Sequence, residues 1–169
     1  MKRIYIFLIL LIGFFVLSGC GENDNESEAS KNMVSFNGTN YKIIGAQFEN
    51  VMSQGEVTSI PISLYLDDNG DNYLSIEIED ADLGKEIDLT KRDNSFWIIY
   101  NNGSTHYNWY QNDNVMSADS FVSGSTARII RNNGLVYTVD VNIVFTSGVG
   151  THTLTAHYKG VVGNNWVDK

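Results

Sequence analysis

Apolar and polar residues alternate with a period of two along most of the chain from Met33 to Lys169. This alternation predicts β-strands with one face in a core and one face toward solvent, because successive side chains of a strand point to opposite sides of the sheet. No segment in this range shows sustained helical periodicity. The sequence therefore predicts a single all-β domain over residues 33–169, long enough to bury a sizeable core.

The clearest pair of strands lies between Ser59 and Asp80, where apolar residues occupy every second position on both sides of a polar turn. A three-residue loop at 68–70, with its glycine in the left-handed conformation, would place Leu64 opposite Leu74 and bring the two apolar faces together. A two-residue turn would mix the faces, so we expect the three-residue loop. Pro61 has no backbone N–H to donate, and we expect an edge strand or a bulge at that position.

A three-stranded meander is expected between Ser125 and Tyr158, with a long apolar face on its middle strand from Leu135 to Phe145. A three-residue loop at 132–134 and a four-residue loop at 147–150 give all three strands a common inner face. The expected opposite pairs are Ile129–Tyr137, Ala127–Val139, Ile143–Leu154, Val141–Ala156 and Val139–Tyr158.

Two further hairpins are indicated by Asn-Gly pairs, at Asn37-Gly38 and within the loop 101–103. With them, about nine antiparallel strands follow one another through short turns. We expect these strands to close as a β-sandwich, because Pro61 indicates a tolerated edge that a closed barrel would lack. The alternative is an up-and-down β-barrel of the lipocalin type.

The N-terminus begins with Lys2 and Arg3, and an uncharged apolar run from Ile4 to Leu17 follows. That run is shorter than the roughly 20 residues that a membrane-spanning helix needs. The order of positive charge, apolar run, small residues and cysteine is similar to the signal peptide of bacterial lipoproteins. The resemblance implies a signal peptide over residues 1–19 and a thioether-linked diacylglycerol on Cys20, which anchors a protein to a membrane without crossing it.

Residues 20–32 connect that cysteine to the β domain. After Cys20 the segment reads GENDNESEASKN, which contains four acidic residues and no apolar residue larger than alanine. Such a segment cannot bury enough surface to fold, so we expect a flexible tether. Its acidic character is similar to the export signal of surface lipoproteins of the Bacteroidota, and a plain solvated spacer is the other interpretation. Gly21, directly after the cysteine, favours the outer membrane.

The chain carries a formal net charge of −9 at pH 7, with 20 acidic and 11 basic residues. Removal of residues 1–19 would take away two basic residues and no acidic one, changing the charge from −9 to −11. Such a surface repels phosphate groups and no basic cluster offsets it, so neither nucleic acid nor phospholipid headgroups are expected partners. Because Cys20 is the only cysteine, the fold must be held by its core without a disulfide.

The acidic loop 67–71 places oxygen ligands at the first, third and fifth positions of a calcium loop. The pattern then fails, because Asn72 stands where a glycine is needed and Ile78 where a chelating glutamate should stand. A tight hairpin loop is the better interpretation, with weak calcium binding as the lesser alternative. Zinc-binding spacing is also missing among the three histidines, which are His106, His152 and His157. We expect no metal and no other cofactor.

Two sets of titratable side chains are weak candidates for catalysis. The register of the meander places His157 opposite Asp140 on the outer face, with Arg128 diagonal to Asp140. No serine or cysteine nucleophile lies near them in the sequence, and cross-strand charge pairs are common on solvated sheet faces. Glu77 and Glu79 share a strand face, as carboxylates often do on the solvent side of a strand, and nothing distinguishes an acid from a base. We therefore do not expect an enzyme.

An aromatic hairpin over residues 96–110 is the strongest candidate for a binding surface. With a three-residue loop at 101–103, we expect Trp97 opposite Tyr107. One face would then carry Trp97, Ile99, Tyr107 and Trp109, and the other Phe96, Ile98, Tyr100, His106, Asn108 and Tyr110.

Only one face of this hairpin needs to line the core. If the other face is exposed, its aromatic rings, flanked by amides and hydroxyls, suit sugar rings or protein partners. The candidate ligand-binding residues are Trp97, Tyr100, Tyr107, Trp109 and Tyr110. The other interpretation is a central strand buried on both faces. We also expect Trp166, near the C-terminus, to plug one end of the sandwich.

Together with the lipoprotein signal and the acidic tether, several short segments resemble small β-sandwich surface lipoproteins of the Bacteroidota. These segments are FNG at 36–38, GKEIDL at 84–89, STARI at 125–129 and AHYKG at 156–160. The resemblance covers most of the chain and implies a location at the cell envelope and a role in binding. It carries no catalytic residues.

We hold three functional hypotheses. The first is a non-enzymatic lipoprotein of the outer membrane, facing the surface or the periplasm, that binds a glycan or another envelope protein through one sheet face. The second is a structural, adhesion or assembly module that pairs an edge strand with an envelope partner. The third is a small barrel that carries an apolar ligand in a cavity lined by Tyr137, Val139, Val141 and tryptophan residues.

Overall fold

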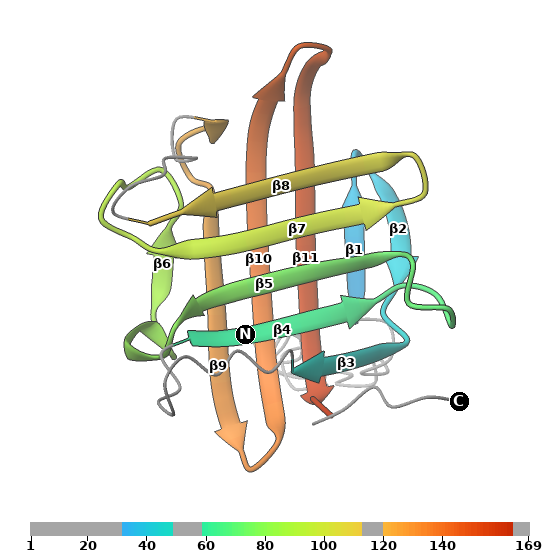
Figure 1. Cartoon of the computed structure of the whole chain (residues 1–169), viewed down its shortest axis with the longest axis vertical. Coiled ribbons are helices and arrows are strands. Elements are labelled where there is room, and N and C mark those ends of the chain that lie inside the picture. Colours follow the sequence, from blue (N-terminus) through green and yellow to red (C-terminus); the bar gives the residue numbers. More distant parts are fainter. Residues whose placement is uncertain (1–31, 49–58, 113–119, 164–169) are drawn as a thin grey trace, which may run out of the picture.

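The structure, a computed structural model, describes residues 32–48, 59–112 and 120–163. Within these residues the chain forms eleven β-strands and a short 3-10 helix at Asp80–Asp82 (Figure 1). The strands are β1 (Met33–Phe36), β2 (Thr39–Lys42), β3 (Gly45–Phe48), β4 (Ser59–Tyr65), β5 (Tyr73–Glu79), β6 (Glu86–Asp88), β7 (Phe96–Asn102), β8 (Thr105–Gln111), β9 (Thr126–Asn133), β10 (Val136–Ser147) and β11 (Gly150–Val161). No helix in this part of the chain is long and apolar enough to cross a membrane. The predicted signal peptide, Cys20, the tether up to residue 31 and Trp166 lie outside the described residues.

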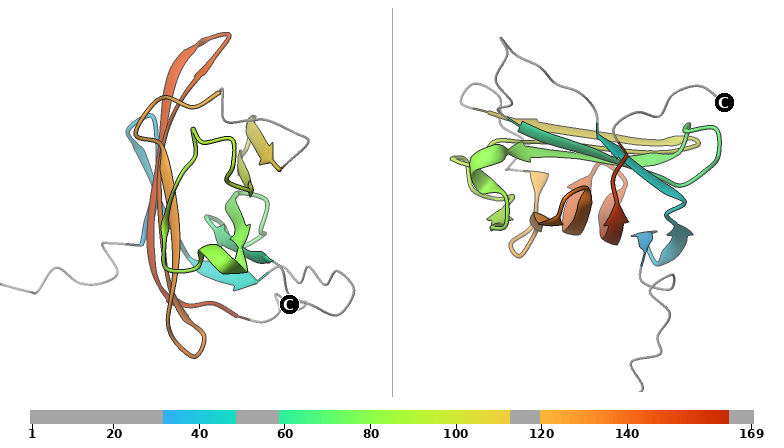
Figure 2. Two further views of the ribbon diagram at one scale, coloured as in Figure 1. Left: turned by 90° about the vertical axis from the view of Figure 1, so that its left-hand side faces the viewer. Right: turned by 90° about the horizontal axis from the view of Figure 1, so that it is seen from below.

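The strands form two antiparallel sheets that face each other as separate layers (Figure 2). The six-stranded sheet has the order β2-β1-β11-β10-β9-β6, and the five-stranded sheet has the order β3-β4-β5-β7-β8. In Figure 1 the strands of the five-stranded sheet cross those of the six-stranded sheet rather than running along them, as in orthogonal sheet packing. The predicted β-sandwich is confirmed, and the barrel alternative is wrong because neither sheet closes on itself.

The predicted register of β4 and β5 is confirmed. Leu64 lies opposite Leu74, and Gly70 in the connecting loop has a φ of 77°. The Asp67 carboxylate fixes the loop, because it accepts hydrogen bonds from the backbone N–H groups of Asp71 at 3.0 Å and Asn72 at 3.2 Å. This acidic side chain therefore serves the turn of the hairpin.

The expectation of an edge strand or a bulge at Pro61 was wrong. β4 lies between β3 and β5, and Pro61 pairs in regular register with Glu77. Among the described residues, the ladder between β3 and β4 ends at the pair Phe48–Ile62, one position before Pro61. Pro61 is therefore tolerated inside the sheet, because the described ladder between β3 and β4 does not extend to Pro61 and requires no backbone N–H group from it.

The meander of β9, β10 and β11 is confirmed in one half and corrected in the other. All predicted pairs between β10 and β11 are present. Between β9 and β10 the register is shifted by two residues, so Ile129 lies opposite Val139 rather than Tyr137. The cause is a two-residue turn at 134–135 together with a bulge beside Tyr137. A shift of two keeps the same side chains inward, but Leu135 is exposed instead of extending the apolar face.

The inward faces of both sheets pack into one apolar core. The largest fully buried side chains are Tyr100, Phe145, Ile62, Leu64, Leu74, Ile76, Ile78, Leu89, Ile98, Ile129, Ile143 and Leu154. Burial of a side chain such as Leu, Ile or Phe stabilises a fold by about 1.5–3 kcal/mol, so this core supplies the stability that a disulfide would otherwise add. Tyr137, Val139 and Val141 also belong to it and line no barrel cavity.

Backbone hydrogen bonds join the two sheets at one corner. Where the chain passes from β2 to β3, the Ile44 N–H donates to the Tyr65 carbonyl at 2.9 Å. Beyond the end of β11, Gly163 makes two hydrogen bonds of 3.0 Å with the backbone of β3. At the start of the described chain, the Asn32 side chain accepts a hydrogen bond from the Lys159 N–H and donates one to the Lys159 carbonyl. The domain therefore begins on the six-stranded sheet, beside β11.

Candidate functional site

The hairpin of β7 and β8 has a register different from the predicted one. Trp97 lies opposite Tyr110 rather than Tyr107, because a two-residue turn at 103–104 replaces the predicted three-residue loop. The predicted and observed registers differ by three residues. An odd shift exchanges the faces of a strand, so β8 turns Tyr107 and Trp109 toward the core and Tyr110 outward.

Contacts with the neighbouring hairpin fix the tip of β7 and β8. The Gly103 N–H donates to Asn72 Oδ1 at 2.7 Å, and Asn101 Nδ2 donates to the Asp71 carbonyl at 2.6 Å. Gly103 has a φ of 60°, which glycine adopts more readily than other residues. These partners lie 30 and 31 positions apart in the chain. The local pattern of Asn and Gly does not reveal them, so it did not give the correct register.

Three of the five predicted binding residues belong to the core. Tyr100 is fully buried, Trp109 is 6% exposed, and Tyr107 packs against the core. The rings of Tyr107 and Trp109 are stacked with centroids 5.4 Å apart, and Trp109 meets Phe145 of the opposite sheet edge-on at 4.8 Å. Burial raises the pKa of the Tyr100 hydroxyl, which accepts a hydrogen bond from Asn102 at 3.1 Å. We exclude these three residues from the candidate site because they lie between the sheets.

The other two predicted residues form an exposed aromatic pair. Trp97 is 40% and Tyr110 is 41% exposed, and their rings meet edge-to-face with centroids 5.8 Å apart. The Trp97 Nε1–H donates to Asn108 Oδ1 at 2.8 Å, and Asn112 Nδ2 donates to the Tyr110 hydroxyl at 2.7 Å. Each ring is therefore held by a hydrogen bond at its polar edge, while much of the side chain stays exposed to solvent.

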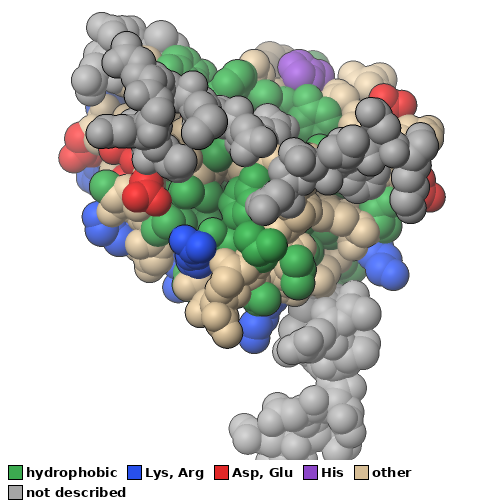
Figure 3. All heavy atoms as spheres, turned by 60° about the horizontal axis from the view of Figure 1, so that its bottom comes forward, with side chains coloured by type: hydrophobic (Ala, Val, Ile, Leu, Met, Phe, Trp, Pro, Cys, Tyr) green, Lys and Arg blue, Asp and Glu red, His purple; other side chains and the backbone are tan. Residues whose placement is uncertain are grey.

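A groove with a volume of about 380 Å³ lies beside this pair, and we call it the outer groove. Its lining residues are Ser59, Glu77, Ile78, Glu79, Ser95, Phe96, Trp97, Tyr110, Gln111 and Asn112. Glu77 lies opposite Trp97 in the ladder of β5 and β7, and its Oε1 accepts a hydrogen bond from the Ser59 hydroxyl. Figure 3 shows apolar side chains reaching the surface on the side it presents, with charged side chains of both signs toward its margins.

The outer surface of the five-stranded sheet is not open along its whole width. β4 is buried on both faces from Pro61 to Leu64, and β5 is buried on both faces from Leu74 to Ile76. Burial on both faces, which was the other interpretation of the hairpin 96–110, is thus found in β4 and β5 instead. Along β7 and β8 the outer face is exposed at Trp97 and Tyr110, next to the outer groove.

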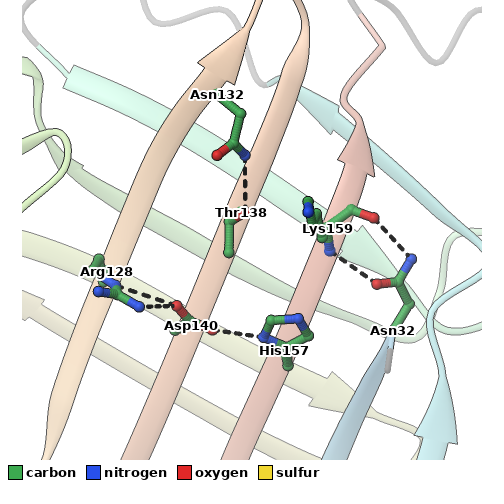
Figure 4. A network of polar contacts seen from close by, with 7 residues as sticks. All are labelled: Asn32, Arg128, Asn132, Thr138, Asp140, His157 and Lys159. Carbon is green, nitrogen blue, oxygen red and sulfur yellow. Dashed lines mark hydrogen bonds and ion pairs between the residues drawn. The ribbon is translucent and has the colours of Figure 1, made fainter. Parts of the chain in front are cut away.

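A second polar cluster crosses the outer face of the six-stranded sheet (Figure 4). Arg128 lies directly opposite Asp140, not diagonal to it, and donates to Asp140 Oδ2 from Nη2 at 2.7 Å and from Nε at 3.2 Å. On the other side, His157 Nδ1 lies 2.7 Å from Asp140 Oδ1, in the predicted pairing. Glu86 lies opposite Arg128 in the next strand. We call Glu86, Arg128, Asp140 and His157 the charged row.

Arg128, Asp140 and His157 of the charged row bond to one another. Burial would raise the pKa of Asp140, but hydrogen bonds from Arg128 and His157 together bring it below its ordinary value. The hydrogen bond with Asp140 also raises the pKa of Arg128. In the described residues His157 has no hydroxyl or thiol partner that would act as a nucleophile. This arrangement is that of a cross-strand ion-pair network.

Comparisons with protein-family models, with curated proteins and with solved structures give no match to this chain. The choice between the two surfaces therefore rests on their chemistry. In the charged row, Arg128, Asp140 and His157 bind one another. In the outer groove, the hydrogen bonds of Trp97 and Tyr110 use the edges of the rings and leave apolar surface for a ligand. The outer groove is the better candidate site.

Metal chemistry finds no support in the parts of the chain that the structure describes. Those parts contain no group of three or more His, Cys, Asp or Glu side chains that could hold a metal ion. The Asp67 carboxylate is occupied by its own loop. His157 lies on the outer face, whereas the ring of His152 packs against core Phe145 at 5.1 Å, so these two histidines lie on opposite faces of β11.

The outer groove contains residues that the sequence did not group with the aromatic hairpin. Glu77 and Glu79 come from β5, which lies beside β7 although β6 of the other sheet separates them along the chain. The alternation of β5 places Glu77 outward, but its position opposite Trp97 depends on that strand order. The predicted register placed Asn108 and Tyr110 on one face of the hairpin and Trp97 on the other. The observed register brings all three to the same face, where Asn108 bonds to Trp97.

Proposed function

We propose that this protein is a non-enzymatic, lipid-anchored protein of the bacterial cell envelope that binds a glycan in the outer groove. The observation that supports the proposal most is the aromatic pair of Trp97 and Tyr110. Both rings are exposed, both border the groove, and each is fixed by an asparagine. Two large aromatic side chains fixed side by side at the surface are typical of a binding site.

The chemistry of the groove suits a sugar. The C–H faces of a sugar ring pack against aromatic rings, and its hydroxyl groups form hydrogen bonds with amides and carboxylates. The outer groove offers the rings of Trp97 and Tyr110, the amide of Asn112 and the carboxylates of Glu77 and Glu79. Because hydrogen bonds already fix both rings, less conformational entropy is lost when a ligand binds.

The anchor proposed at Cys20 is compatible with this site. The described chain begins at Asn32, which is bonded to β11 of the six-stranded sheet. The outer groove lies on the outer face of the five-stranded sheet, which is the opposite layer of the sandwich (Figure 2). A tether that joins the domain on the six-stranded side leaves the groove accessible to a glycan. We propose the outer membrane as the location.

The proposal is tested by titrating the full chain, purified in detergent, with a panel of polysaccharides while tryptophan fluorescence and heat of binding are followed. Trp97→Ala should abolish the binding. Leu135→Ala is the matched control, because Leu135 is 42% exposed and lies in the turn between β9 and β10, outside the groove. A panel without any response, or equal binding by both variants, would contradict a glycan site at this position.

An assembly module is the second candidate, and β8 is the observation that favours it. β8 is the last strand of the five-stranded sheet, and its sequence THYNWYQ contains no Lys, Arg, Asp, Glu or Pro. Edge strands without such residues can add a strand from another protein. Crosslinking on intact cells should then recover one envelope protein in stoichiometric amount. Trp97→Ala should leave that complex intact, because strand addition uses the backbone.

A further inference from the structure

The charges around the outer groove have one sign. Among the described residues, its lining includes the carboxylates of Glu77 and Glu79 and contains no Lys, Arg or His. The two glutamates are two positions apart in β5, so they project from the same face of the sheet. The chain as a whole adds to this field, since its formal net charge is −9. The groove therefore presents a negative potential to any ligand that enters it.

The position of Glu77 places one of these negative charges beside the ring of Trp97. It lies directly across from Trp97 in the ladder, and its Oε1 accepts a hydrogen bond from Ser59. Its Oε2 has no hydrogen-bond partner among the described residues. The face of an indole ring attracts cations more strongly than that of any other aromatic side chain. A protonated amine beside Trp97 would be attracted by the ring and by the carboxylate at the same time.

An anionic sugar would meet the opposite situation. A uronic acid or a sulfated sugar would bring a second negative charge beside Glu77 and Glu79, and like charges repel in a groove partly shielded from water. The described residues that line the groove include no basic side chain to offset that repulsion. A neutral sugar would gain stacking and hydrogen bonds, but no ion pair. The three classes of glycan therefore differ in affinity because of the same two carboxylates.

We infer that the outer groove selects glycans with free, protonated amino groups, of the amino-sugar class, over neutral and anionic glycans. The inference rests on the proposed function, because it names the class of glycan bound by the same groove. The amine forms an ion pair with Glu77 and lies against the ring of Trp97. The sugar ring that carries it packs on the aromatic pair.

The test uses four oligosaccharides of equal length, built from glucose, N-acetylglucosamine, glucosamine or a uronic acid. Each is titrated by calorimetry into the full chain in detergent at about pH 6, where amines are protonated and carboxylates ionised. At about 50 mM salt, the glucosamine oligomer should bind at least about tenfold more tightly than the two neutral oligomers. The uronic acid oligomer should not bind detectably.

Two variants and a salt series locate the selectivity. Glu77→Gln alone, and together with Glu79→Gln, should bring the affinity for the glucosamine oligomer down to that for the neutral oligomers. Glu86→Gln is the matched control, because it removes the same charge from β6 of the opposite sheet and should keep the preference. In the unmodified protein, raising the salt concentration to about 500 mM should reduce the preference for the glucosamine oligomer over the neutral oligomers, because salt screens the ion pair.

The outcomes separate this inference from the function on which it rests. Equal binding of the glucosamine and neutral oligomers overturns the inference and leaves a neutral glycan as ligand. A preference that survives Glu77→Gln with Glu79→Gln, or that Glu86→Gln removes equally, also overturns it, because the field of the whole chain would then be the cause. If none of the four oligomers binds, the proposed function itself is contradicted.

Discussion

The two faces of the β7–β8 hairpin are both rich in aromatic residues, but their surroundings are opposite. The inner face places Tyr100 and Trp109 between the sheets, where Trp109 packs against Phe145. The outer face places Trp97 and Tyr110 at the surface, with an asparagine bonded to each ring. Residues of the same kind thus stabilise the fold on one face and form a candidate ligand site on the other. The register of a single hairpin decides which residue has which role.

The outer face of the six-stranded sheet extends this comparison. There the side chains of Arg128, Asp140 and His157 contact one another, so their polar groups are used within the protein. On the outer groove, the asparagines occupy only the polar edges of the rings. A side chain can thus be fixed by a hydrogen bond at its polar edge and still keep part of its ring exposed to a ligand, as Trp97 does.

The largest expected effect distinguishes the two faces by stability. Trp109→Ala should lower the free energy of unfolding by about 3–5 kcal/mol, because it empties part of the core. Trp97→Ala should lower it by only about 1–2 kcal/mol, because the side chain is 40% exposed. Urea unfolding followed by circular dichroism measures both. Similar losses in the two variants would mean that the assignment of the faces is wrong.

The next effect separates the ring of Tyr110 from its hydroxyl. Tyr110→Ala should weaken glycan binding about tenfold, because it removes one of the two rings of the platform. Tyr110→Phe keeps the ring and loses only the oxygen that accepts a hydrogen bond from Asn112, so its loss should be about two- to threefold. Calorimetric titration gives both affinities. If the two variants lose equally, the hydroxyl rather than the ring face carries the contact.

The comparison also shows which part of the fold the sequence was able to predict. β4 and β5 each have one apolar and one polar face, so only one register brings Leu64 and Leu74 together, and that register is observed. β7 and β8 are apolar or aromatic on both faces, so alternation does not distinguish the registers. The turn decides, and it is fixed by Asn72, which bonds to Gly103 from another hairpin.

The candidate site was predicted in part for the same reason. Trp97 and Tyr110 were recognised as surface candidates from the aromatic content of the hairpin, but so were three residues that lie inward. The acidic side of the groove depends on β5 lying beside β7, with β6 placed in the other sheet. No local pattern encodes this order of strands, so the pairing of Glu77 with Trp97 was not predictable from the sequence.

A smaller effect tests whether fixing the indole ring matters. Asn108→Ala removes the acceptor for the Trp97 Nε1–H, so the ring should become more mobile and glycan binding should weaken about three- to fivefold. Asn132→Ala is the matched control, because Asn132 bonds to Thr138 on the six-stranded sheet and should leave binding unchanged. Unchanged binding in Asn108→Ala would mean that the ring is held by packing alone.

The smallest effect concerns stability and pH on the charged row. The pKa of Asp140 is lower in the folded protein than its ordinary value, which is about 3.9 in an unfolded chain. A carboxyl group with a lowered folded-state pKa contributes stability above the unfolded value, and this contribution is lost as the pH falls through the folded-state value. Asp140→Asn should therefore reduce the free energy of unfolding at about pH 7 by about 0.5–1 kcal/mol, a modest figure because the side chain is 31% exposed.

The Asp140→Asn variant also tests whether the charged row and the outer groove are independent of each other. Below about pH 4 the difference in unfolding free energy between Asp140→Asn and the unmodified protein should shrink, because Asp140 is protonated first in the unfolded state and, once the pH falls below the lowered folded-state pKa, in the folded state as well. Urea unfolding at a series of pH values measures this difference. Glycan affinity at about pH 7 should be the same in both proteins, because Asp140 lies on the outer face of the opposite sheet. A stability difference that stays constant with pH would contradict the role of the carboxylate, and a loss of glycan binding would show that the two surfaces are coupled.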